Sequence, residues 1–161
     1  MHSTIYQIGT KPIAESDILL PDNIVAGEMA SISYIYEDTE EGREHDIKCL
    51  VEDIFPKGMF TLSAKDTLTY NGGFMMWRKT HYDNIKALSA QLTPANVMNW
   101  DGPIRLLKKA ISNPLGTAAL FVTEFYGGGG TAECSADFMD MVSNMKKGEK
   151  LYLGAILGYH F

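Results

Sequence analysis

Residues 116–138 read GTAALFVTEFYGGGGTAECSADF and contain the clearest structural signal in the chain. An apolar run from Ala118 to Tyr126 leads into four consecutive glycines, Gly127 to Gly130. Both faces of the run are apolar except at Thr123 and Glu124, a pattern typical of a strand that is covered on both sides. We therefore expect this segment to be the most deeply buried strand of a sheet.

Two patterns compete after the glycines. Strand spacing places Ala132, Cys134, Ala136 and Phe138 on one face and polar residues on the other. Helical spacing instead brings Ala132 together with Ala136 and Met139. The strand alternation is the more regular of the two, so we favour a hairpin arm to about Phe138 over a helix.

Other strands and a first helix follow from the same periodicities. Strands are expected at residues 3–8, 29–36 and 151–161, where polar and apolar residues alternate or apolar residues dominate. Asp38-x-x-Glu41 has the form of a helix-capping box. The stripe of Ile47, Leu50, Val51 and Ile54 then has helical spacing, and Pro56 and Gly58 end the segment.

The middle of the chain is expected to hold half of a hairpin and two more helices. Residues 59–68 resemble the hairpin half, with a turn at 71–73. The second helix is expected from Thr80 to Leu92, capped by Thr80-x-x-Asp83, with Tyr82, Ile85, Leu88 and Leu92 buried. The third is expected to open at 101–103 and to close at 113–114. These elements predict a single α+β domain over residues 1–161, with a mixed or antiparallel sheet and about three helices.

Charge and composition exclude some classes of function and favour others. The chain has 161 residues, 45% of them hydrophobic, and a net charge of −6, which argues against nucleic-acid binding. Residues 1–60 hold 12 acidic and 4 basic residues, so this part alone carries −8. A field of one sign can steer a basic partner. The acidic block suggests five partner-binding residues: Glu37, Asp38, Glu40, Glu41 and Glu44.

The sequence also suggests a location. The N-terminal residues MHSTIYQIG have neither a basic start nor an apolar segment, so no secretory signal is expected. No apolar run approaches the ~20 residues needed to cross a bilayer, so no membrane partner is expected. Cys49 and Cys134 form no disulfide framework, and we expect a reducing, cytoplasmic location.

Candidate chemistry is sparse. The glycine run has no phosphate-loop lysine, and no metal-ligand spacing occurs, so we expect neither cofactor nor metal and name no catalytic residue. Cys134 fits a buried structural thiol better than a nucleophile. The alternative is a ligand pocket or small active site beside the glycine turn. It would use Glu124, Tyr126, Gly127, Gly128 and Glu133, with the two carboxylates converging in a cleft.

Residues 121–136, FVTEFYGGGGTAECSA, resemble a hairpin pattern of small immunity-type proteins from bacterial toxin systems. In that pattern a strand ends in an aromatic residue before GGxG, and a second strand with small residues follows. The match covers about one tenth of the chain, and Glu133 stands where a glutamine is common. The resemblance implies a cytoplasmic binding protein that neutralises a partner, with no catalytic residues.

The leading hypothesis is therefore a non-catalytic, immunity-like interaction protein that binds a basic partner through its acidic residues. A small enzyme or ligand-binding protein is the first alternative. A structural or phage-type accessory protein, assembled through an apolar surface, is the second.

Overall fold

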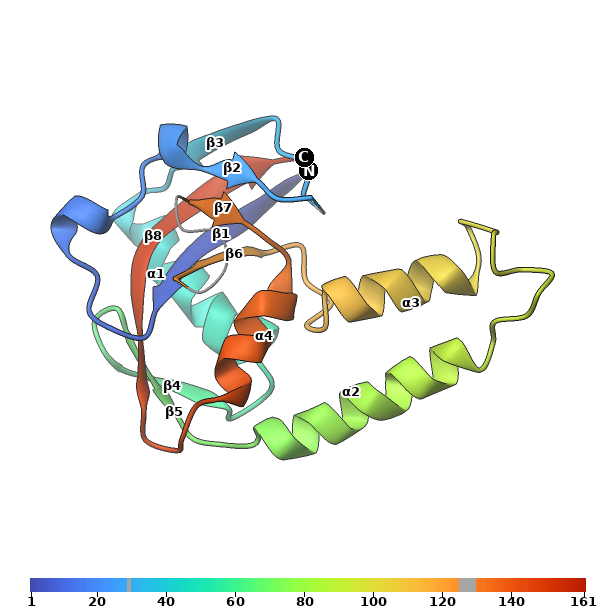
Figure 1. Cartoon of the computed structure of the whole chain (residues 1–161). Coiled ribbons are helices and arrows are strands. Elements are labelled where there is room, and N and C mark those ends of the chain that lie inside the picture. Colours follow the sequence, from blue (N-terminus) through green and yellow to red (C-terminus); the bar gives the residue numbers. More distant parts are fainter. Residues whose placement is uncertain (29, 125–129) are drawn as a thin grey trace.

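The computed structural model describes residues 1–28, 30–124 and 130–161 (Figure 1). Its described residues form four α-helices and a six-stranded mixed sheet, which confirms the predicted α+β class. The strands are β1 (His2–Gly9), β2 (Val25–Ala26), β3 (Tyr34–Glu37), β4 (Phe60–Ala64), β5 (Thr67–Tyr70), β6 (Leu120–Thr123), β7 (Thr131–Ala132) and β8 (Lys150–His160). The helices are α1 (Glu40–Cys49), continued by a π-helical turn (Leu50–Ile54), α2 (Phe74–Ser89), α3 (Pro103–Ser112) and α4 (Ser135–Ser143).

Strand β8 is at the centre of the sheet. The strand order is β4-β5-β8-β1-β6, and β3 also pairs with β8. Along one edge β8 is antiparallel to β1, and along the other it pairs first with β5 and then with β3. β6 lies beyond β1 and parallel to it. The segment expected to be most deeply buried, β6, is indeed buried throughout, but it is the last strand of this order.

A bulge in β8 determines which side chains face which layer. Tyr6 pairs with Ile156 and Ile8 with Leu153, so two residues of β8 oppose the single residue Gln7. Beyond the extra residue, the side chains of β8 alternate between the two faces of the sheet in the opposite order. Leu153 and Ile156 therefore lie in the same core cluster, although they are three residues apart.

The main core lies on one face of the sheet, against α1 and α4. Its centre is an aromatic stack in which the Phe138 ring lies 4.8 Å from that of Phe121 and 5.1 Å from that of Phe55. A second cluster, which includes Ile5, Leu120, Leu157 and Tyr159, fills the opposite face. The β2–β7 pair extends the structure on that side, because Ala132 of β7 belongs to the second cluster.

Helices α2 and α3 pack against each other and project from the sheet as an arm (Figure 1). A buried polar network fixes the base of the arm to α4. The Ser135 hydroxyl donates to Asn113 Oδ1 (2.7 Å) and accepts from the Leu115 N–H (3.0 Å). The Asn113 side chain also donates to the Thr117 carbonyl.

The start of α2 differs from the prediction. The helix begins at Phe74 after Gly73, which has φ 95°, and not at Thr80. Phe74 is buried and Trp77 packs on the core, so tertiary contact replaces a side-chain cap. Tyr82, expected to be buried, is 61% exposed. The third predicted helix agrees closely with α3.

The segment after the glycines is also corrected. Only Thr131 and Ala132 form a strand, and helix α4 follows where a hairpin arm was favoured. Phe138, Met139 and Val142 are buried at helical spacing against the main core, which decides between the two patterns.

One hairpin turn and one helix cap lie elsewhere than predicted. Residues 60–70 form a complete hairpin, β4–β5, which turns at Asp66 with φ 58° rather than at 71–73. The N-cap of α1 is Thr39, whose hydroxyl accepts from the Gly42 N–H, and not Asp38. The Asp38 carboxylate instead accepts from the N–H of the next residue, Thr39, whereas a capping box would use the N–H of Glu41.

Ser135→Ala tests the network at the base of the arm. The substitution leaves the side-chain oxygen of Asn113 and the N–H of Leu115 without their partner. We expect the free energy of unfolding to fall by about 1–3 kcal/mol. Urea unfolding followed by circular dichroism measures the change. Ser143→Ala, at the exposed end of the same helix, is the matched control and should change little. Equal effects of the two substitutions would contradict the role of the network.

Candidate functional site

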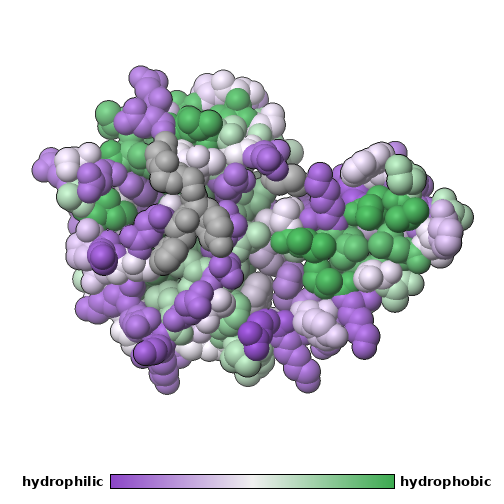
Figure 2. Space-filling model, viewed as in Figure 1, coloured by the Kyte–Doolittle hydropathy of each residue, from purple (hydrophilic) through white to green (hydrophobic). Residues whose placement is uncertain are grey.

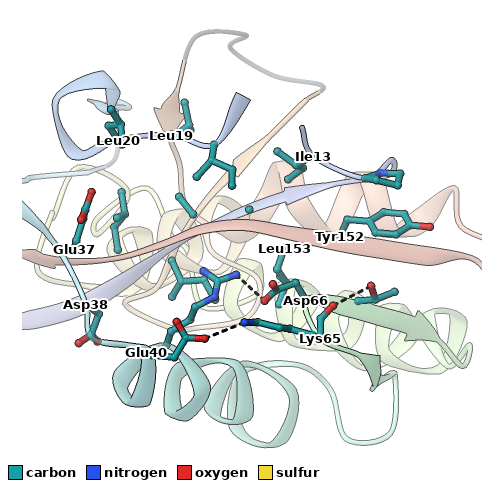
Figure 3. A pocket seen from close by; sticks show the side chains of 18 of the residues that line it. Ile13, Leu19, Leu20, Glu37, Asp38, Glu40, Lys65, Asp66, Tyr152 and Leu153 are labelled. Carbon is teal, nitrogen blue, oxygen red and sulfur yellow. Dashed lines mark hydrogen bonds and ion pairs between the residues drawn. The ribbon is translucent and has the colours of Figure 1, made fainter. Parts of the chain in front are cut away.

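A cavity of about 510 Å³ lies over the middle of β8, in the gap between β3 and β5 (Figure 3). β5 pairs with β8 as far as Tyr152, and β3 starts to pair at Leu157. Among the described residues, no strand pairs with residues 153–156 on that edge. We call this cavity the β8 groove.

One wall of the groove is apolar and comes from the loop after β1. Ile13, Leu19 and Leu20 lie on one side of β8, and the charged side chains of α1 and of the β4–β5 turn lie on the other (Figure 3). Buried Leu153 and Ile156 form part of the floor. A groove with an apolar floor and one charged wall suits an amphipathic ligand or peptide segment.

Gln7 holds the apolar wall in place. Its amide nitrogen donates to the Asp17 carbonyl (2.8 Å), and its oxygen accepts from the N–H groups of Leu19 (3.1 Å) and Ala155 (2.9 Å). The side chain crosses β8 directly over Gly154, where an added Cβ would lie 2.3 Å from the Gln7 oxygen. The bulge and the missing side chain of Gly154 thus position the loop that forms the wall.

Two ion pairs order the charged wall. Arg43 binds Asp66 at 2.7 Å, and Lys65 binds Glu40 at 2.9 Å (Figure 3). The hydrogen bond from Lys65 lowers the pKa of the Glu40 carboxyl, and the same bond raises the pKa of Lys65. The basic side chains in the groove are therefore already neutralised by neighbouring acids.

The five acidic residues predicted to bind a partner are all exposed, and they lie between the end of β3 and the first turns of α1. Glu37, Asp38 and Glu40 line the β8 groove. Glu44 lines a neighbouring cavity of about 410 Å³ with Ile47 and Leu62. Within the described parts of the chain, Glu40 is the one member of the five that forms an ion pair. We call these five residues the α1 acidic cluster.

The residues of the alternative pocket divide between two places. Glu124 accepts hydrogen bonds from the backbone and hydroxyl of Thr10 and lines a cavity of about 400 Å³ beside Gly130. Glu133 does not line that cavity, and its carboxyl lies against Gly27. Burial, followed by the charge of Asp137, raises the pKa of the Glu133 carboxyl.

Three further members of that predicted pocket, Tyr126, Gly127 and Gly128, lie outside the described residues. A cleft built from both carboxylates therefore stays a prediction.

A cysteine–histidine contact that the sequence reading missed is present on α1. Cys49 Sγ lies 3.5 Å from His45 Nε2, and the i, i+4 spacing on a helix was the available signal. A nucleophilic cysteine needs a lowered thiol pKa. Burial, followed by the negative charge of Asp53, raises the pKa of Cys49 instead. Cys134, considered as a nucleophile, is half-buried at the N-cap of α4, and burial raises its pKa too.

Across residues 1–28, 30–124 and 130–161, no group of three or more His, Cys, Asp and Glu side chains is placed to hold a metal ion. None of the helices in this part of the chain combines the length and the apolar character that crossing a membrane requires.

Comparisons with protein-family models, with curated proteins and with solved structures gave no match for this chain.

Gly154→Ala tests how the apolar wall is held. The new methyl group would overlap the Gln7 side chain and lie 2.9 Å from Ile13 Cδ1, and overpacking of this kind costs about 1–3 kcal/mol. We expect lower stability in urea and faster amide hydrogen exchange at Leu19. Gly102→Ala is the control, since its added Cβ would have no neighbour nearer than 3.4 Å. Unchanged exchange at Leu19 would contradict the proposed support.

Alkylation tests the Cys49 environment. Because its thiol pKa is raised, iodoacetamide at pH 8 should modify Cys49 more slowly than it modifies glutathione. A one-unit difference in pKa changes the thiolate fraction about tenfold. Asp53→Asn should increase the rate at this site, whereas Glu41→Gln should not. Site-resolved mass spectrometry gives both rates, and a Cys49 faster than glutathione would show that the thiol is activated after all.

Proposed function

We propose that the protein is a non-catalytic interaction protein that binds a basic partner through the α1 acidic cluster. The observation that carries this proposal is the unpaired negative charge at and beside the β8 groove. Arg43 and Lys65 are neutralised by Asp66 and Glu40. The other four carboxylates of the cluster remain exposed, with no ion pair to a described residue.

The groove beside the cluster supports the same proposal. Charged groups give a partner fast capture and orientation, whereas apolar contacts supply most of the affinity. Here the carboxylates of Glu37 and Asp38 lie at a cavity whose floor and opposite wall are apolar. A partner segment that carries lysine or arginine next to an apolar side chain would satisfy both walls.

An immunity-like role is the form of this function that we favour. Neutralising a basic enzyme requires a stable acidic surface and no chemistry of its own. The raised thiol pKa of Cys49 and the engagement of Glu124 by Thr10 both fit a protein that acts by binding. A cytoplasmic location belongs to the same proposal.

The test is a capture experiment from the native host, with bound proteins identified at low and high salt. We expect one stoichiometric basic protein, released at high salt, on the wild type. The triple reversal Glu37→Lys, Glu41→Lys and Glu44→Lys should reduce its recovery at least about tenfold, because the opposing charges are lost. Glu40 is spared so that its ion pair with Lys65 persists.

The matched control reverses three exposed acids that do not line the β8 groove: Asp53→Lys, Asp83→Lys and Asp140→Lys. It has the same net charge as the triple reversal. Recovery by the control but not by the triple reversal would assign binding to the α1 acidic cluster. Equal recovery by both variants would show that the proposed surface is wrong.

A further inference from the structure

The arm of α2 and α3 exposes apolar side chains in unusual number. Figure 2 shows hydrophobic residues gathered on the visible face of the arm, over α3 and toward its tip. Met76, Met98 and Trp100 are 78%, 79% and 64% exposed, and Leu106 and Ile111 are also exposed. Contiguous exposed apolar surface on a folded domain marks an interaction site.

The arm also carries a charge opposite to that of the body. Residues 74–112 contain six basic and two acidic residues, a net charge of +4. The rest of the chain contains eight basic and eighteen acidic residues, a net charge of −10. Arg105, Lys108 and Lys109 of α3 are all exposed. The arm therefore needs an acidic partner surface with apolar neighbours.

Each copy of the chain presents such a surface. The α1 acidic cluster is bordered by exposed Leu20 and Leu62. The cavity between α1 and β4, lined by Leu62, Ile47 and Glu44, can receive an apolar side chain from outside. Arm against arm would bring two positive surfaces together, whereas arm against cluster pairs opposite charges.

We propose that the α2–α3 arm docks onto the α1 acidic cluster of a second copy of this chain. Within one molecule the arm projects away from the sheet (Figure 1), so the contact is made between copies. If each arm engages the other copy, the pair has two-fold symmetry and both surfaces are satisfied in a closed dimer.

This inference uses the same carboxylates as the proposed function, so a basic partner and a second copy would compete for them. Self-association and partner binding can be disproved independently of each other. Self-association is measured with the purified chain alone, and partner binding is measured by capture from the host.

Sedimentation velocity of the full-length chain tests the proposal. At about 50 mM salt we expect a dimer. At about 500 mM salt we expect a higher dimer dissociation constant, because salt screens the attraction between the exposed charges. Lys108→Glu with Lys109→Glu should raise the dimer dissociation constant at least about tenfold. Lys146→Glu with Lys147→Glu is the matched control, an adjacent pair of exposed lysines before β8, and should leave the constant unchanged.

Mixing experiments identify the opposing surface. Glu41→Lys with Glu44→Lys should weaken the dimer as the arm variant does. An equimolar mixture of the arm variant and the cluster variant should form a mixed dimer, because the reversed arm of one meets the reversed cluster of the other. Circular dichroism confirms that each variant is folded.

Three results would overturn the proposal. The first is a wild type that stays monomeric up to about millimolar concentration, far above ordinary dimer affinities. The second is a dimer that survives the arm reversal, and the third is a mixture that fails to associate. A monomer that sediments with phosphatidylserine vesicles, and loses this with Lys108→Glu and Lys109→Glu, would assign the arm to a lipid surface instead.

Discussion

The packing of Gln7 across Gly154 is the contact on which the rest of the structure depends. It marks a bulge in β8, the strand that pairs with β1, β3 and β5. The bulge makes Leu153 and Ile156 face the same core, and a slip by one residue would reverse every side chain beyond it. The same Gln7 side chain ties down the loop at Leu19. Strand register and the wall of the β8 groove therefore have one physical origin.

The arm stands outside this arrangement. Both core clusters are built mainly from the strands, α1 and α4, and α2 contributes only its first turn, through Phe74 and Trp77. Exposed apolar residues farther along the arm thus add little to folding, while they increase the tendency to associate. The buried bond between Ser135 and Asn113 fixes the base of α3 on the body. A projecting element with a fixed base and an apolar surface is better explained by binding than by stability.

The sequence predicted the parts of the fold that local patterns determine. Strand β8 was predicted correctly because apolar residues dominate its run. Helix α3 was predicted correctly because helical periodicity agrees with Pro103 at its start and Pro114 just after its end. Helix α4 was missed because Ala132, Cys134 and Phe138 also alternate at strand spacing, and only the stacking of Phe138 on Phe55 and Phe121 decides between the patterns. The α1 acidic cluster could be named from charge alone. The groove beside it could not, because it is a gap between β3 and β5 on a strand about one hundred residues away in sequence.

Charge separation connects the two surfaces. Lys65 and Arg43 pair with Glu40 and Asp66 within the body, and Lys48 pairs with Glu52, so Glu41 and Glu44 of α1 form no ion pair with a described residue. Six basic residues lie on the arm, which points away from α1 in the same molecule (Figure 1). This separation of charge is the basis of both proposed binding modes. If a second copy occupies the cluster as proposed, a basic partner must bind more tightly than self-association at the prevailing concentration. Access to the acidic cluster would then depend on protein concentration and salt, with no change of fold required.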